Sequence, residues 1–341
     1  MPPRNSENLG SSLPPPSNLN KPLASQRDDL HPAPGRKPKV EDLGFCEFSS
    51  GTNPVVDIVA IHGLDGHREK TWMTGDGTLW LRNFLSTDLP NARVLSYGYD
   101  ANTGDQECIS TQTMRRHADG FANALARKRR EAPRRPIIFI AHNLGGIILK
   151  WALVICHNQR VTSKCNLRNI LVSTHAILFF GTPHSGVEDN MLEAIKRVAS
   201  VYMYTTDVIL RDLRANSSEL ENVQSLYLEA SDKINTMFFY EEYATEGQRE
   251  PFVPYHSATI AGDREANSIV LHANHHDLVR FGSKENVNYE TVIDYLTEYV
   301  QSASAQVGPK WVTEDRFRSA AMGQSNPEQD LPPRYVEKAT T

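Results

Sequence analysis

The stretch "PIIFIAHNLGG", residues 136–146, decides the fold of this chain. Its apolar run predicts a buried strand, and the following "GGIILKWALVICHN" (145–158) predicts an apolar helix. A sharp turn between such a strand and helix is where the pattern G-x-S-x-G exposes a serine nucleophile. Here the pattern reads Ala141-His142-Asn143-Leu144-Gly145, so an asparagine stands where the serine is expected.

Strands and helices alternate on both sides of this turn. The expected strands are 55–64, 92–100, 135–144, 174–186, 234–243 and 252–260, and the expected helices are 79–89, 110–130, 145–158 and 288–303. Strands that are apolar throughout and separated by helices are typical of a mostly parallel sheet covered on both faces. In such sheets the functional residues gather at the carboxyl ends of the strands.

Composition divides the chain into three parts. Residues 1–45 and 313–341 are poor in large apolar side chains and rich in proline, serine and other polar residues, so we predict two disordered tails. The first tail is a candidate arm for a protein partner. Residues 46–312 form the predicted folded domain, in which 188–234 is mostly helical and is a candidate cap over the site.

Charge and cysteine usage exclude several classes of protein. The net charge of -5 gives no argument for nucleic-acid binding, and the four cysteines form no C-x-x-C pair, so we expect no metal site and no disulfide framework. The basic run "ARKRREAPRRP" (126–136) ends a predicted helix, where cations suit the helix dipole. No signal peptide and no apolar run long enough to span a bilayer are seen, and we expect a soluble, cytoplasmic protein.

Several phrases, in a fixed order, carry a family resemblance over roughly residues 54–300. They are "VDIVAIHGLDGHREKTW", "WLRNFLSTDLPNARVLSYGYDA", "PIIFIAHNLGGIILKWAL", "AILFFGTPHSG", "FFYEEYAT", "PYHSATI" and "ANHHDLVRF". Together they resemble the serine-hydrolase-like α/β-hydrolases of the DUF676/SERAC1-type lipase group. The fungal members are most similar, including those found as N-terminal domains of NLR-like proteins. The resemblance implies an α/β-hydrolase fold, an ester or lipid-like ligand and no cofactor.

The resemblance also implies a catalytic triad in the chain order nucleophile, acid, histidine. The nucleophile position is Asn143, the acid matches Glu241 of "FYE", and the histidine matches His275 of "ANHHDLVRF". The alternatives that stay open are Glu242 and Asp263 for the acid, and His276 and His272 for the histidine.

The oxyanion hole of this fold needs two backbone N–H groups. The resemblance assigns them to Leu144, after the nucleophile position, and to Leu64, in the loop "HGLDG". The other residues expected around the pocket are His62, Gly63, His142 and His184. Two of these have a structural interpretation as well: His62 caps its loop, and His184 holds the turn "GTPHSG".

Asparagine suits the turn but not the chemistry. It is among the non-glycine residues that best tolerate the positive φ of such a turn. Its amide, however, is not a nucleophile that a histidine can activate. Four hypotheses follow: a pseudohydrolase that binds a ligand or partner, an enzyme with non-hydrolytic chemistry, an engineered inactive variant, or hydrolysis of Asn143 to aspartate. The last ranks lowest because no sequence feature promotes it.

Overall fold

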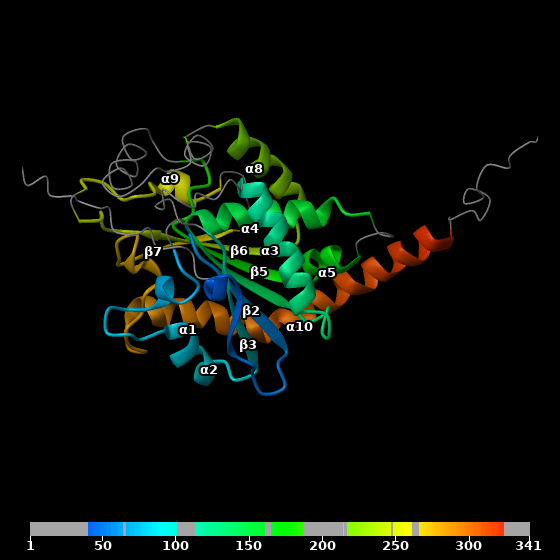
Figure 1. Cartoon of the computed structure of the whole chain (residues 1–341), viewed down its shortest axis with the longest axis horizontal. Helices are drawn as coiled ribbons and strands as arrows, with labels where there is room; N and C mark the ends of the chain where they lie inside the picture. The colour runs from blue at the N-terminus through cyan, green and yellow to red at the C-terminus, as the bar shows by residue number, and fades with distance from the viewer. Residues whose placement is uncertain are drawn as a thin grey trace, which may run out of the picture. The chain divides into compact units, whose positions relative to one another are not determined.

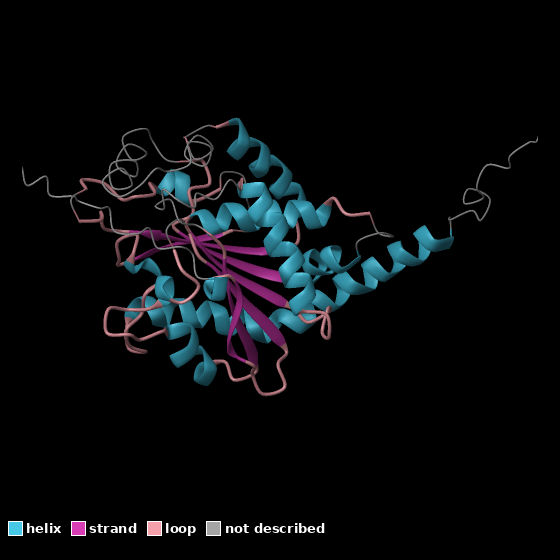
Figure 2. Ribbon diagram, in the orientation of Figure 1, coloured by secondary structure: helices cyan, strands magenta, loops and turns pink. Residues whose placement is uncertain are grey.

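The apolar runs of the sequence form one seven-stranded sheet with the strand order β1-β3-β2-β4-β5-β6-β7 (Figures 1 and 2). The computed structural model describes residues 40–63, 66–100, 113–160, 165–186, 214, 217–246, 248–260 and 266–323. The strands are β1 (Gly44–Ser49), β2 (Val56–Ile61), β3 (Ala92–Gly98), β4 (Ile137–His142), β5 (Thr174–Phe180), β6 (Asn235–Glu241) and β7 (Asn267–Leu271). Only β1 runs antiparallel to its neighbour, which confirms the predicted mostly parallel sheet.

Helices cover both faces of the sheet (Figure 1). One face packs against α3 (Met114–Lys128), α4 (Leu144–His157), α5 (Cys165–Ser173) and α8 (Ser218–Ala230). The other packs against α1 (Trp80–Asn83), α2 (Leu85–Asp88) and α10 (Val287–Gly323). Short helical turns are η1 (Val40–Asp42), η2 (Lys70–Trp72), η3 (Asp277–Val279) and α9 (Tyr255–Ala258).

Strand β2 shows how the apolar runs build two cores. Its side chains alternate between the faces of the sheet, so Val59 and Ile61 belong to the core under α3 and α4. Ile58 and Ala60 belong to the core under α10. A strand that is buried on both faces must be apolar at nearly every position, which is the signal that the sequence gives.

Two predicted boundaries and one predicted strand are wrong. The folded region begins before residue 46, because β1 starts at Gly44 and pairs with β3. It continues past residue 312, because α10 runs to Gly323. Glu314 lies inside the predicted tail and is nevertheless buried, held by Arg168 at 2.7 Å and Arg318 at 2.9 Å.

The segment 252–260, predicted as a strand, contains the helix α9 instead. Pro254, whose fixed φ suits the residue that precedes a helical turn, is its N-cap. The last strand is β7, where the sequence analysis placed no element. The predicted cap over 188–234 is helical in α8, while 188–213 and 215–216 lie outside the described residues.

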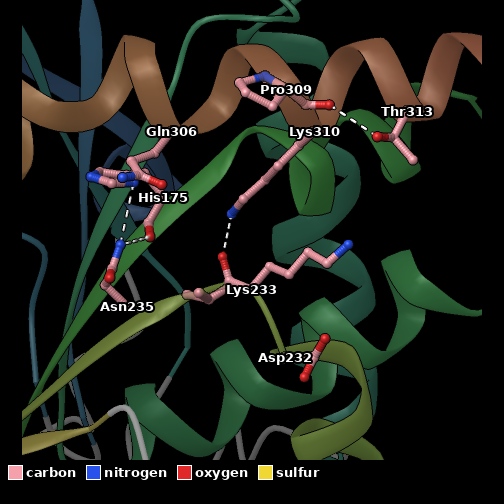
Figure 3. A pocket seen from close by; sticks show the side chains of 9 residues that line it. His175, Asp232, Lys233, Asn235, Gln306, Pro309, Lys310 and Thr313 are labelled. Carbon is pink, nitrogen blue, oxygen red and sulfur yellow. Dashed lines mark hydrogen bonds between the residues drawn. The ribbon is translucent and has the colours of Figure 1, made fainter.

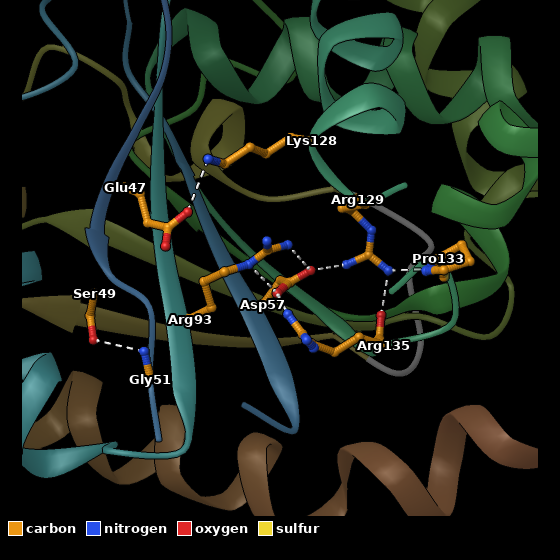
Figure 4. A network of polar contacts seen from close by, with 9 residues as sticks. All are labelled: Glu47, Ser49, Gly51, Asp57, Arg93, Lys128, Arg129, Pro133 and Arg135. Carbon is orange, nitrogen blue, oxygen red and sulfur yellow. Dashed lines mark hydrogen bonds and ion pairs between the residues drawn. The ribbon is translucent and has the colours of Figure 1, made fainter. Parts of the chain in front are cut away.

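The basic run 126–136 is explained by a buried carboxylate (Figure 4). Asp57 of β2 is fully buried and accepts hydrogen bonds from Arg93 at 2.8 and 2.9 Å, from Arg135 at 2.9 Å, and from Arg129. Arg129 is itself buried, and burial lowers its pKa to about 10. The run therefore ties the end of α3 and the start of β4 to the centre of the sheet.

Candidate functional site

The turn between β4 and α4 holds Asn143 in a strained conformation. Its φ of 51° and ψ of -128° lie in a region that few non-glycine residues adopt. The turn is fixed because the Asn143 backbone N–H donates to the carbonyl of Phe180 at 3.0 Å. The positive φ expected at the nucleophile position is therefore present.

Glycines let neighbouring backbone approach this turn. A Cβ atom added at Gly145 would lie 2.4 Å from the carbonyl oxygen of His62, and one added at Gly63 would lie 2.5 Å from the Cβ of Asn143. Any larger residue at either position would push the loop after β2 away from the turn. The absence of side chains at Gly63 and Gly145 thus allows the loop after β2 to lie against the Asn143 turn.

Glu241 and His275 form a buried pair beside the turn. Glu241 is the last residue of β6, and His275 follows β7. The Nδ1 atom of His275 lies 3.2 Å from Oε1 of Glu241, and both side chains are almost entirely shielded from solvent. The same carboxylate oxygen accepts the backbone N–H of Val253 at 2.7 Å, which fixes the direction of the acid.

The imidazole of His275 is packed on two sides. The Phe252 ring lies 4.4 Å from it, centroid to centroid, and the His142 ring lies 4.9 Å away. His142 Nε2 is also 3.2 Å from the backbone oxygen of His275. Sequence reasoning missed Phe252 and Val253, because they lie in a segment interpreted as a strand and carry no motif.

The amide of Asn143 bridges the histidine and the predicted oxyanion hole. Its Oδ1 accepts the backbone N–H of Leu144 at 2.5 Å, and its Nδ2 lies 2.6 Å from Nε2 of His275. An N–H group can only donate, so the atom facing Leu144 is the amide oxygen and the atom facing His275 is the amide nitrogen. The amide nitrogen is a donor, so Nε2 of His275 accepts and Nδ1 carries the proton toward Glu241. This is the tautomer that a serine triad uses.

The alternative acid and histidine pair with each other away from Asn143. Glu242 Oε2 lies 2.5 Å from Nδ1 of His272, and both side chains are largely exposed. The ring of His276 lies 6.1 Å from that of His275, centroid to centroid, and no described hydrogen bond joins it to Glu241. Asp263 and Leu64 lie outside the described residues.

His62 and His184 show structural contacts. His62 stacks on Tyr99 with ring centroids 4.5 Å apart, and its Nδ1 lies 2.9 Å from the carbonyl of Gly63; burial lowers its pKa to about 4. The ring of His184 packs edge to face with the stacked rings of Phe179 and Phe238, and burial lowers its pKa well below 6.5. Both residues hold loops at the carboxyl ends of strands.

A separate hollow of about 510 Å³ opens at the opposite ends of the strands (Figure 3). It is lined by His175, Asp232, Lys233, Ile234, Asn235, Gln306, Pro309, Lys310 and Thr313. The Lys310 ammonium donates to the carbonyls of Thr174, at 2.8 Å, and Lys233, and burial lowers its pKa to about 8. These contacts attach α10 to the sheet, so the polar residues around the hollow have a structural role.

The described residues show neither a metal centre nor a membrane span. No group of three or more histidine, cysteine, aspartate or glutamate side chains in the described residues is arranged to hold a metal ion. Among the helices that the structure describes, none combines the length and apolarity needed to cross a bilayer.

The sequence of this chain is similar to those of known proteins. No protein-family model matches the chain. It is 26% identical over 267 residues to Protein SERAC1 of Homo sapiens and 27% identical over 267 residues to that of Mus musculus. Each match covers 71% of this chain, and the chain spans only 38% of the length of these curated relatives.

Among solved structures, the mature form of the Bacillus licheniformis lipase BlEst2 matches with a TM-score of 0.50 and 13% identity. The match covers 74% of this chain and 97% of the lipase. The chain therefore has the α/β-hydrolase fold, as predicted, and is a distant relative of Protein SERAC1.

Proposed function

We propose that this chain binds an ester or lipid-like molecule in the pocket of an α/β-hydrolase and that its asparagine form does not make an acyl-enzyme. One observation carries the proposal. The Asn143 amide is hydrogen-bonded both to Leu144 N–H and to His275 Nε2, while His275 keeps its partner Glu241. A histidine with a carboxylate partner and one backbone N–H donor thus surround residue 143, whose side chain is not a nucleophile.

The chemistry of the amide explains why ordinary turnover stops. The lone pair of an amide nitrogen is delocalised, so His275 cannot turn Asn143 into a nucleophile by taking a proton. In addition, Oδ1 occupies Leu144 N–H at 2.5 Å, the donor that an ester carbonyl would use. Serine proteases that lose a triad member keep roughly 10³–10⁴-fold catalysis over water, far below their full activity.

The class of ligand follows from the scaffold. A histidine–carboxylate pair beside a turn with a backbone N–H donor suits an acyl carbon with a polarised oxygen. The lipase with the same fold supports an ester or lipid-like molecule, whose acyl group would approach Asn143.

The test compares Asn143→Ser with Asn143→Ala, neither of which carries the amide. We expect Asn143→Ser to hydrolyse p-nitrophenyl esters of one or more chain lengths and to react with a fluorophosphonate probe. Asn143→Ala should do neither. Adding His275→Ala to Asn143→Ser should remove hydrolysis, since the serine then lacks its base.

A folded Asn143→Ser protein that neither reacts with the probe nor cleaves any ester overturns the proposal. So does ester cleavage by Asn143→Ala that is as fast as that by Asn143→Ser, because a nucleophile at position 143 would then contribute nothing. Melting curves of each variant show whether it is folded.

A further inference from the structure

The side-chain amide of Asn143 takes the position, between a backbone N–H donor and the histidine, that the acyl group of a substrate would take. Its carbonyl oxygen receives the Leu144 N–H at 2.5 Å, and its nitrogen lies 2.6 Å from Nε2 of His275. In a serine hydrolase, a bound acyl group has its oxygen on the same kind of N–H donor and its leaving atom beside the histidine. The carbon between them, here Cγ of Asn143, is the atom that water attacks.

We propose that His275 and Leu144 N–H hydrolyse the side-chain amide of Asn143 itself, so that the residue becomes an aspartate. The inference rests on the same site as the proposed function. It turns the lowest-ranked sequence hypothesis into the one that the side-chain geometry favours, because the sequence could not show where the two ends of the amide point.

The reaction balances with water as the only co-reactant. The hydrogen bond from the amide nitrogen to Nε2 of His275 first opens. Nε2 then accepts a proton from a water molecule whose oxygen bonds to Cγ, and the charge on Oδ1 is stabilised by Leu144 N–H. Nε2 then gives the proton to Nδ2 as the Cγ–Nδ2 bond breaks and ammonia leaves. Glu241, 3.2 Å from Nδ1, stabilises the imidazolium that exists between the two steps.

The tautomer deduced above is the one that this reaction needs. Nε2 of His275 carries no proton at the start, because it accepts the amide N–H. Its lone pair can act as a base toward water once this hydrogen bond opens. Val253 N–H at 2.7 Å and the ring of Phe252 hold Glu241 and His275 in position. Positioning of this kind gives the half-buried amide of Asn143 a reactivity that a freely exposed amide lacks.

The competing route to aspartate is attack by the Leu144 nitrogen on Cγ, which closes a ring and yields isoaspartate as well. That nitrogen already donates its hydrogen to Oδ1 and begins helix α4 in a buried position. It would have to lose this hydrogen bond and leave the first turn of the helix. The two routes therefore predict different products and a different dependence on His275.

Two other asparagines of the chain serve as internal controls. Asn53 shares the positive φ, at 50°, but is exposed, and no described hydrogen bond joins it to a histidine. Asn274 accepts the backbone N–H of His276 at 3.0 Å, and its Nδ2 faces the carboxylate of Asp277 at 2.9 Å. It has the backbone contact of Asn143 without the imidazole.

The experiment follows residue 143 by peptide mass spectrometry in protein incubated near pH 7.5 in heavy-oxygen water. We expect the amide-to-acid mass change at Asn143, with one heavy oxygen incorporated and no isoaspartate. Asn53 and Asn274 should keep their amides over the same time. His275→Gln should slow the change by roughly 10²- to 10⁴-fold, the usual contribution of general acid–base catalysis. The inference is equally supported if residue 143 is already aspartate in purified wild-type protein and is still asparagine in purified His275→Gln.

Three results overturn the inference: an amide that persists at Asn143, conversion at an equal rate in a folded His275→Gln protein, or isoaspartate at this position. Glu241→Gln, which keeps the imidazole but weakens its support, should also slow conversion. An amide that persists while Asn143→Ser reacts with the fluorophosphonate probe removes this inference and leaves the proposed function. Conversion of Asn143 to aspartate, together with an Asn143→Ser protein that does not react, supports this inference and removes the proposed function.

Discussion

Asn143 satisfies a backbone requirement and a side-chain requirement at once. At a φ of 51° the turn excludes most residues, and asparagine is among the non-glycine residues that tolerate a positive φ best, although the ψ of -128° keeps this conformation strained. Its amide then provides an acceptor for Leu144 N–H and a donor for Nε2 of His275, so two buried polar groups are paired. The same residue thus stabilises the turn and fills the positions of the reacting groups.

Substitutions that remove the amide should separate these two roles. Asn143→Gly and Asn143→Ala both lose the hydrogen bonds, so they differ only in backbone preference. We expect the glycine variant to be more stable than the alanine variant by about 1–2 kcal/mol in urea unfolding, the cost of a left-handed conformation. Glycine is normally the less stable of the two. As a control, Gly75, whose added Cβ meets nothing within 4 Å, should gain stability on change to alanine.

At the scale of elements, the buried strands were predictable and the last strand was not. Strands β2, β4 and β5 are buried at every position, so their sequences are apolar at most positions. Strand β7 lies at the edge, and most of its residues are at least partly exposed, so its pattern is weak. The β-branched and aromatic residues of 252–260 resembled a strand more closely, although Pro254 begins a helical turn there.

The candidate site was also predictable only in part. Its order along the chain was readable from phrases at strand ends, and the structure brings Asn143, Glu241 and His275 together. The contacts of Val253 and Phe252 depend on a loop that folds back over the acid, and no local pattern encodes such a contact.

The ion cluster of Asp57 joins four elements, and its disruption should lower the free energy of unfolding substantially. Asp57→Asn removes the only carboxylate that the described contacts place on Arg93, Arg129 and Arg135, of which Arg129 is almost fully buried. We expect a loss of about 3–5 kcal/mol in the free energy of unfolding, since removal of one partner leaves buried charge unpaired. The matched control is Asp315→Asn, whose pair with Arg134 is largely exposed and should cost under about 1 kcal/mol. Equal losses in the two variants would show that the cluster is no more than a surface network.

At the scale of the whole molecule, His62 and His184 are buried and His117 is half-buried, and no described ion pair joins any of them to a carboxylate. Burial lowers the pKa of His62 and of His117 to about 4, and that of His184 well below 6.5, where the neighbouring Lys150 adds to the effect. In the unfolded chain these groups return to 6.5, so between pH 6.5 and about 4 the unfolded state binds more protons. Their contribution to stability is therefore complete above pH 6.5 and is lost as the pH falls.

We expect the free energy of unfolding in urea to drop steeply between pH 6.5 and pH 5. Each such histidine contributes about 1.4 kcal/mol per pH unit in this window. His184→Leu should flatten the drop by up to one histidine's share, because the ring that it replaces packs against Phe179 and Phe238 and makes no described hydrogen bond. His256→Leu, at an exposed position of α9, is the control and should leave the slope unchanged. A slope that is the same in wild type and His184→Leu would mean that His184 is protonated inside the folded protein, and its packing against the two phenylalanines would then need a charged partner.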